Sequence, residues 1–255
     1  MRIARFSHND AIRFGIVDES DLVVLDGDPM FAGFETTGER VPLSDVALLA
    51  PVIPRSKVVG VGRNYRDHAA ELGNEVPAAP MLFFKPNTAV VGPGDAVVLP
   101  RHSEFVSFEG ELAAVIGRIT RNVTAEAALD HVFGYTIAND VTARDWQKSD
   151  GQWARAKGFD TSCPLGPAIE TEFDVRGDAV IETRVNGEVR QRGPISDMIF
   201  SLPEIIEFAS AAFTLLPGDV ILTGTPAGVG QLTAGDTVDV EITGLGTLRN
   251  TARSA

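Results

Sequence analysis

FEGELAAVIG (residues 108–117) places two glutamates within an otherwise apolar run. Residues two apart in a β-strand point to the same face, so Glu109 and Glu111 share a face that becomes apolar beyond Glu111. An unpaired buried carboxylate is unfavourable. The strand therefore either exposes the pair to solvent at a sheet edge or buries it around a cation. A divalent ion with hard oxygen ligands would suit the second arrangement.

A third acidic residue follows in IANDVTARDWQ (137–147), where an apolar strand ends at Asp140. We expect a helix over 141–148 after it, and the spacing of Asp140, Arg144 and Gln147 then places them on one helical face. Asp140 would either cap this helix or join the two glutamates as a metal ligand. Three carboxylates on or beside apolar strands indicate a metal triad.

Two further segments carry groups suited to acid–base chemistry. Lys157, in WARAKGFDTSCPLGP (153–167), would bind a carboxylate or stabilise an enolate, or else lie on the surface. His68 and Glu71 are three residues apart in a short expected helix. A glutamate beside an imidazole orients it and raises its basicity, as in a general base. The alternative is a solvated pair on a helix surface.

Composition excludes several classes of protein. The 255 residues are 44% hydrophobic with a net charge of −13, and no cluster of Lys and Arg supplies the basic stripe that nucleic acid or an anionic membrane requires. No apolar run approaches the roughly 20 residues of a membrane span. The start resembles no signal peptide and the single cysteine, Cys163, forms no internal disulfide, so we expect a cytoplasmic protein.

The order of elements predicts an α+β chain that is mostly β. Short apolar runs over 1–52 indicate a small β-rich N-terminal domain, and 53–255 would form a metal-dependent catalytic domain. Asn186-Gly187 is a strong hairpin signal, and 202–213 has the periodicity of an amphipathic helix. Another helix is expected over 124–132. Because strands outnumber helices, mixed or antiparallel sheets are favoured over regular βαβ repeats.

The glycine-rich stretches do not indicate nucleotide binding. GVGRNY (60–65) lacks the third glycine of a dinucleotide fingerprint, and TGTPAGVG (223–230) lacks the Gly-Lys-Ser/Thr of a P-loop. Thr225, just after an apolar strand, would offer its hydroxyl to a substrate carboxylate or simply form a turn.

These motifs together resemble the short members of the fumarylacetoacetate hydrolase superfamily: acylpyruvate hydrolases, oxaloacetate decarboxylases and the 2-hydroxyhepta-2,4-diene-1,7-dioate isomerase/decarboxylase group. The resemblance covers roughly residues 53–250, and Ser162 stands where many relatives have an aromatic residue. The motifs that carry it, in order, are GRNYRDH, FFKP, FEGELAAVIG, GYTIANDVTARDWQ, RAKGFDTSCPLGP and LTGTPAGVG.

The resemblance implies a mixed β-sandwich roll for the catalytic domain, a small β-rich N-terminal domain, and a homodimer. It implies that Glu109, Glu111 and Asp140 are metal ligands. The ion would be Mg²⁺ or Mn²⁺, with Ca²⁺ as an alternative.

The resemblance also implies roles for other residues. His68 and Glu71 would form a dyad on a lid segment, Gln147 and Lys157 would face the substrate oxyanion, and Thr225 would contact a substrate carboxylate. Two residues that it places near the site without a fixed role are Arg63 and Arg144.

The reaction expected from these parts proceeds through a metal-stabilised enolate of a small anionic α-keto acid, with cleavage of a C–C bond. Acylpyruvate hydrolysis and oxaloacetate decarboxylation both fit. The alternative is a 2-hydroxyhepta-2,4-diene-1,7-dioate isomerase/decarboxylase of aromatic catabolism. A metal-dependent keto-acid binder without catalysis is a third hypothesis, and the presence of both His68 and Glu71 favours an enzyme over it.

Overall fold

Strand β11 (Gly110–Ile116) lies in the interior of the largest of three sheets, and all seven of its residues are buried. The computed structural model describes residues 1–255. On either side of β11, β12 (Val132–Asn139) and β17 (Val220–Leu222) pair with it in antiparallel register. The stretch that includes the two glutamates is therefore an inner strand.

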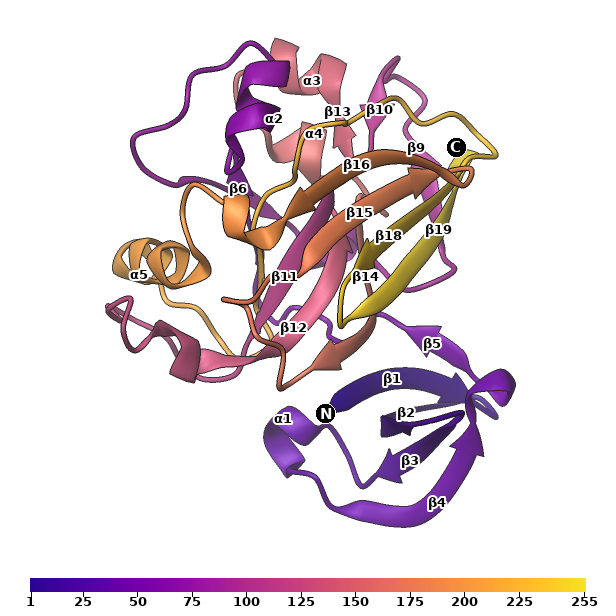
Figure 1. The fold of residues 1–255 in the computed structure, drawn as a ribbon. Coiled ribbons are helices and arrows are strands. Elements are labelled where there is room, and N and C mark those ends of the chain that lie inside the picture. Colours follow the sequence, from indigo (N-terminus) through magenta and orange to yellow (C-terminus); the bar gives the residue numbers. More distant parts are fainter.

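The larger sheet has twelve strands, ten of them in the order β4-β3-β2-β1-β14-β12-β11-β17-β6-β7 (Figure 1). A sheet of five strands, β16-β15-β18-β19-β9, packs against it. The remaining strands of the larger sheet are β1 (Arg2–His8), β2 (Ala11–Asp18), β3 (Asp21–Leu25), β4 (Thr36–Pro42), β5 (Ala47–Leu49), β6 (Val58–Gly62), β7 (Met81–Lys85), β8 (Val90–Val91) and β14 (Cys163–Glu170). Those of the second sheet are β9 (Ala96–Leu99), β15 (Val180–Val185), β16 (Glu188–Pro194), β18 (Thr237–Ile242) and β19 (Gly246–Ser254).

The main core lies between the two sheets, because alternate residues of each strand face the space between them. Leu112, Ala114 and Ile116 of β11 belong to the same buried cluster as Ile181 of β15 and Val240 of β18. The residues between them on β11 belong to a separate cluster on the opposite face. The predicted mostly-β sandwich is confirmed.

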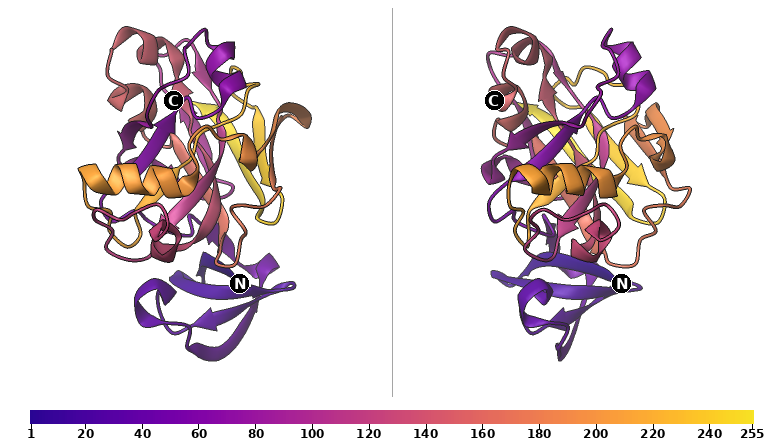
Figure 2. Two further views of the ribbon diagram at one scale, coloured as in Figure 1. Left: turned by 60° about the vertical axis from the view of Figure 1, so that its left-hand side comes forward. Right: turned by 90° about the vertical axis from the view of Figure 1, so that its left-hand side faces the viewer.

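The N-terminal strands form the predicted small β-rich domain, with a cluster of its own that includes Phe6, Leu22 and Val41. Strand β1 also pairs with β14, so the domain is joined to the larger sheet by backbone hydrogen bonds. In all three views it lies at the end of the molecule opposite helices α2, α3 and α4 (Figures 1 and 2). A boundary at residue 52 stays a prediction.

The helices are short, and none is long and apolar enough to cross a membrane. The predicted amphipathic helix is present as α5, with its apolar face buried. The bounds are α1 (Pro29–Ala32), α2 (Arg66–Glu71), α3 (Arg144–Ser149), α4 (Ala154–Gly158) and α5 (Leu202–Ala212).

Two expected helices differ in the structure. The helix expected over 141–148 begins only at Arg144, because Thr142–Ala143 forms strand β13 and pairs with β10 (Val106–Ser107). The helix expected over 124–132 is reduced to a single 3₁₀ turn, Ala128–His131. No side chain caps the start of either helix. The local sequence therefore does not mark where these two helices begin.

Candidate active site

Three buried carboxylates meet where β11 begins and β12 ends. Glu109 directly precedes β11, Glu111 is its second residue, and Asp140 directly follows β12. The register pairs Gly110 with Asn139, so antiparallel pairing brings the three side chains together. They are 3%, 2% and 0% exposed, and one oxygen from each lies within 4.8 Å of the others. The solvent-exposed alternative for the glutamate pair is wrong.

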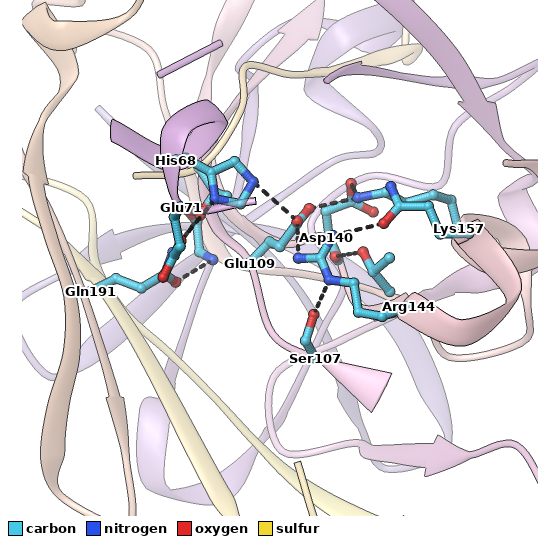
Figure 3. Close-up of polar contacts among 12 residues, drawn as sticks. His68, Glu71, Ser107, Glu109, Asp140, Arg144, Lys157 and Gln191 are labelled. Atoms are coloured by element: carbon cyan, nitrogen blue, oxygen red, sulfur yellow. Dashed lines mark hydrogen bonds and ion pairs between the residues drawn. The ribbon is translucent and has the colours of Figure 1, made fainter. Parts of the chain in front are cut away.

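Three cations contact two of these carboxylates, and Figure 3 labels two of the three, Lys157 and Arg144. Lys157 Nζ lies 2.6 Å from Glu109 Oε2 and 2.6 Å from Asp140 Oδ2. Lys85 Nζ lies 2.6 Å from Asp140 Oδ1, and Arg144 Nη2 contacts Glu109 Oε1. Both oxygens of Glu109 and both oxygens of Asp140 are thereby paired with positive charge.

No lysine or arginine forms an ion pair with Glu111. It accepts one hydrogen bond, from the backbone N–H of Gly224 at 2.7 Å. Burial, and then repulsion from Asp140 and Glu109, raises the pKa of Glu111 well above its ordinary value. Burial acts in the same direction on Glu109, but Arg144 and Lys157 outweigh it and hold the pKa of Glu109 well below its ordinary value.

This donor set fits a divalent metal ion. Hard carboxylate oxygens within reach of one another are the ligands that Mg²⁺ and Mn²⁺ take. The uncompensated charge of Glu111 is the one that such an ion would neutralise. Burial tends to lower the pKa of Lys157, yet Asp140 and Glu109 raise it, so Lys157 remains a cation beside the triad.

The imidazole of His68 lies between Glu71 and the triad (Figure 3). Its Nδ1 is 3.3 Å from Glu71 Oε2, and its Nε2 is 3.6 Å from Glu109 Oε1. His68 is only 4% exposed, so the solvated-pair alternative is wrong. Burial lowers the pKa of His68, and this effect outweighs the nearby Glu109, which raises it. With a lowered pKa the imidazole is neutral at neutral pH and can accept a proton. Glu71 also accepts the N–H of Gly228.

Arg144 organises the side of the site formed by α3. Its Nε donates to Ser107 Oγ at 2.7 Å and its Nη1 donates to Gln147 Oε1 at 2.9 Å. Gln147 lines the cavity, and its amide NH₂ donates no hydrogen bond within the protein. The predicted helical face shared by Asp140, Arg144 and Gln147 is wrong for Asp140, because α3 begins only at Arg144. Asp140 instead joins the same cluster through Lys157, which contacts both Glu109 and Asp140.

Thr225 is buried beside the triad, and its hydroxyl is already engaged. Its Oγ1 donates to the Gly110 carbonyl at 2.8 Å and accepts from Gln191 Nε2 at 2.7 Å. A substrate carboxylate would receive a hydrogen bond from this hydroxyl only after the bond to Gly110 breaks. The predicted role for Thr225 stays a prediction.

Sequence reasoning missed two residues of the cluster, Lys85 and Gln191. Lys85 is 1% exposed and ends the apolar strand of the FFKP segment; a lysine closing such a strand was a usable signal. Gln191 accepts the Gly110 N–H at 3.0 Å and fixes Thr225. It lies in an ordinary polar stretch of β16, where no local pattern marks it.

Ser162 and Cys163 have structural surroundings. The Ser162 hydroxyl donates to the carbonyl of Lys157 at 2.8 Å, so the serine holds the C-terminal end of α4 in place. Burial raises the pKa of the Cys163 thiol to about 12, which makes it a poor nucleophile.

A cavity of about 590 Å³ opens above the cluster. Asp140 lies beneath the cavity and does not line it. The predicted residues that do are Arg63, His68, Glu71, Glu109, Glu111, Arg144, Gln147, Lys157 and Thr225. The structure thus gathers every predicted site residue at one place, while their individual roles remain predictions.

Comparison with known proteins gives matches to both parts of the chain. Residues 57–253 match the family described as fumarylacetoacetate (FAA) hydrolase C-terminal, and residues 1–51 match Rv2993c-like, N-terminal. The chain is 48% identical over 223 residues to oxaloacetate tautomerase YisK of Bacillus subtilis (strain 168), covering 82% of this chain and 73% of the relative.

Two solved structures extend the comparison. The crystal structure of 2-hydroxyhepta-2,4-diene-1,7-dioate isomerase from Mycobacterium marinum has a TM-score of 0.92 and 48% identity, covering 100% of this chain and 98% of that one. Fumarylpyruvate hydrolase from Pseudomonas aeruginosa, in complex with Mn²⁺ and pyruvate, has a TM-score of 0.75 and 35% identity, covering 80% and 91%. The match spans most of the chain, and the chain therefore belongs to the fumarylacetoacetate hydrolase family.

Proposed function

We propose that this protein is a divalent-metal-dependent enzyme that breaks a C–C bond of a small anionic α-keto acid, with hydrolysis of an acylpyruvate as the first candidate reaction. The observation that carries the proposal is the buried His68, held by Glu71 directly beside the carboxylate triad. Decarboxylation of oxaloacetate would pass through the same enolate. Decarboxylation needs no base to activate water. The presence of the His68–Glu71 dyad therefore favours hydrolysis over decarboxylation.

Glu109, Glu111 and Asp140 would hold the ion. Mg²⁺ or Mn²⁺ bound there would act as a Lewis acid toward the keto and carboxylate oxygens of the substrate. Support comes from the oxygen donor set, from the uncompensated Glu111, and from the Mn²⁺ in the related fumarylpyruvate hydrolase structure.

The chain's own residues would divide the remaining work. His68 would take a proton from water, whose oxygen then bonds to the distal carbonyl carbon of the substrate. The C–C bond between that carbon and the pyruvate methylene breaks, and its electron pair forms the pyruvate enolate. Lys157 and the amide of Gln147 would stabilise the oxygen on which negative charge develops. Protonation of the enolate carbon gives pyruvate, and the other product is a carboxylic acid.

Keto–enol tautomerisation or diene isomerisation is the second candidate. The same imidazole would move a proton between two atoms of the substrate, with no water consumed. The relatives named as an oxaloacetate tautomerase and a diene-dioate isomerase, each 48% identical to this chain, favour it. A homodimer and a cytoplasmic location stay predictions.

The test is pyruvate release from metal-stripped protein given acetylpyruvate or oxaloacetate, with and without Mg²⁺ or Mn²⁺. The rate with metal alone is subtracted, because oxaloacetate decarboxylates without enzyme. Hydrolysis predicts metal-dependent pyruvate from acetylpyruvate that His68→Gln abolishes and His8→Gln, in the N-terminal domain, does not. Enol-to-keto conversion of oxaloacetate without pyruvate release would favour the tautomerase. Bound metal with neither activity would favour a binder.

A further inference from the structure

Gly110 lies between the two glutamates of the triad, and side chains hold its backbone in place. Strand β17 pairs with Ala113–Val115 of β11, so Gly110 lies beyond the end of that pairing. Its N–H donates to Gln191 Oε1 at 3.0 Å, and its carbonyl accepts from Thr225 Oγ1 at 2.8 Å. Buried backbone groups need hydrogen-bond partners, and here two side chains take the place of a neighbouring strand.

Gln191 closes these contacts into a ring. Its Nε2 donates to Thr225 Oγ1 at 2.7 Å and to the carbonyl of Pro226 at 2.7 Å. The hydrogen bonds therefore run from Gly110 to Gln191, from Gln191 to Thr225, and from Thr225 back to Gly110. Gln191 is 0% exposed, and the oxygen and both hydrogens of its amide have partners within the protein. It can act on the site only through the groups that it holds.

The second sheet reaches the Gly110 backbone because this residue has no side chain. A Cβ at Gly110 would meet Thr183 Oγ1 at 2.2 Å and Val240 Cγ1 at 2.9 Å. Both distances are shorter than close-packed atoms allow, so any other residue would push the two sheets apart. The close approach lets Gln191, on β16, bond to the backbone between two candidate metal ligands.

The ring holds both peptide units that connect the glutamates. The N–H of Gly110 belongs to the unit that follows Glu109, and its carbonyl belongs to the unit that precedes Glu111. Gln191 therefore orients the first unit, and Thr225 orients the second. One oxygen from each glutamate must come within reach of the same ion, although the two carboxylates repel each other. A rotation of either peptide unit would move these oxygens apart.

The same amide holds the loop that supports the dyad. Gln191 contacts the carbonyl of Pro226, and two residues later the N–H of Gly228 donates to Glu71. A Cβ at Gly228 would meet the carbonyl oxygen of Arg190 at 2.0 Å, so β16 packs directly against this loop. Gln191 thus connects the strand of the triad to the loop that contacts Glu71.

We propose that Gln191 is a positioning residue of the metal site: by holding the Gly110 backbone within the ring, it fixes how far apart the carboxylates on either side lie. The inference rests on the proposed function, since it assumes that the triad holds an ion. Loss of an outer partner of a metal ligand weakens metal binding about 10- to 100-fold. Because Gln191 acts through the backbone, we expect an effect at the lower end of this range.

The test measures Mn²⁺ affinity by calorimetry on the full chain. Gln191→Met keeps the length of the side chain and removes its hydrogen bonds, so it should weaken Mn²⁺ binding about tenfold. Thr225→Val keeps the shape of the side chain and opens the ring on its other side, so it should also weaken binding. Thr225→Ser keeps the hydroxyl and should retain most of the affinity.

A double variant tests whether the two residues act as one unit. Because they close one ring, Gln191→Met with Thr225→Val should bind Mn²⁺ about as weakly as Gln191→Met alone. Two independent contacts would instead multiply the two losses. This comparison needs no assumption about the reaction that the protein catalyses.

Asn250→Leu is the matched control. Asn250 is 2% exposed on β19 of the same sheet and does not line the cavity. Its amide donates to the carbonyls of Gly92 and Asp95, each at 2.9 Å, as that of Gln191 donates to two groups. The control should lower stability in urea as Gln191→Met does, without changing Mn²⁺ affinity.

Unchanged Mn²⁺ affinity in both Gln191→Met and Thr225→Val would overturn the inference, and so would an equal loss of affinity in Asn250→Leu. If the unmodified protein bound no Mn²⁺, the metal site of the proposed function and the inference would both be wrong. Mn²⁺ affinities in the expected order, without turnover of any keto acid, would contradict the proposed reaction and support the inference.

Discussion

A single buried carboxylate lies at one end of strand β17 (Val220–Leu222), and the carboxylate triad lies at the other. Asp219 directly precedes the strand and is fully buried. It accepts hydrogen bonds from Lys57 Nζ at 2.7 Å, from Ser56 Oγ at 2.8 Å and from the backbone N–H of Leu216 at 2.9 Å. Burial would raise its pKa, but these contacts outweigh burial and lower it.

The group at the other end is incompletely compensated. Glu111 accepts one backbone N–H, from Gly224 just beyond β17, and contacts no cation. Its pKa is raised where that of Asp219 is lowered. The comparison teaches that burial alone does not mark a functional carboxylate. In a structural carboxylate such as Asp219, hydrogen bonds and a cation of the protein satisfy the oxygens. In a cation-binding site, at least one carboxylate, here Glu111, has no cation of the protein beside it.

The largest effect should come from Glu111→Gln. Loss of an outer-shell partner already weakens metal binding about 10- to 100-fold, so loss of a ligand should exceed 100-fold and abolish metal-dependent turnover. The metal-free variant should be about as stable as the original protein, because Gln keeps the shape of Glu111 and the raised pKa means that the neutral form is already favoured there. Calorimetry with Mn²⁺ and thermal unfolding measure the two effects. Unchanged Mn²⁺ affinity would refute the ligand assignment.

Lys157→Met should lower turnover about 100-fold, because an ammonium beside the developing charge is lost. Mn²⁺ should bind at least as tightly as before, since Lys157 and a divalent ion would share oxygens of Glu109 and Asp140. Steady-state kinetics and calorimetry separate the two effects. Lys57→Met, at the other end of β17, is the control and should leave turnover per folded molecule unchanged. Equal losses of turnover in both variants would contradict the comparison.

Asp219→Asn should destabilise the protein by about 3 kcal/mol, because Lys57 loses its partner and the donors around Asp219 lose a charged acceptor. Urea unfolding measures the change. Mn²⁺ affinity of the folded variant should match that of the original protein. A clear loss of Mn²⁺ affinity with little change in stability would mean that the two ends of β17 are not independent.

The smallest effect concerns pH. Because the pKa of Asp219 in the folded state is below its ordinary value of 3.8, its ionised form stabilises the fold above that pH. This contribution is lost as pH falls through the folded-state pKa. The difference in unfolding free energy between Asp219→Asn and the original protein should therefore narrow below about pH 4. A difference that stays constant from pH 7 to pH 3 would show that ionisation of Asp219 adds nothing.

Local patterns in the sequence were sufficient for much of this molecule. The period of two placed Glu109 and Glu111 on one face, and the end of an apolar run placed Asp140 beside a strand terminus. Asn186-Gly187 forms the predicted hairpin with φ values of 53° and 82°, which that turn requires. Each of these signals depends on neighbouring residues alone. The family resemblance added Arg63 and implied that the other site residues belong to one site.

Only the tertiary structure decided how charge is distributed among them. Lys85 meets Asp140 across 55 positions of sequence, and Gln191 meets Gly110 across 81. Helix α3 begins at Arg144 because a distant strand pairs with the two residues before it. That Glu111 lacks a cation while Asp219 has one depends on which side chains the sheets bring together. Electrostatic energy depends on distances in space, and a strand pattern does not contain them.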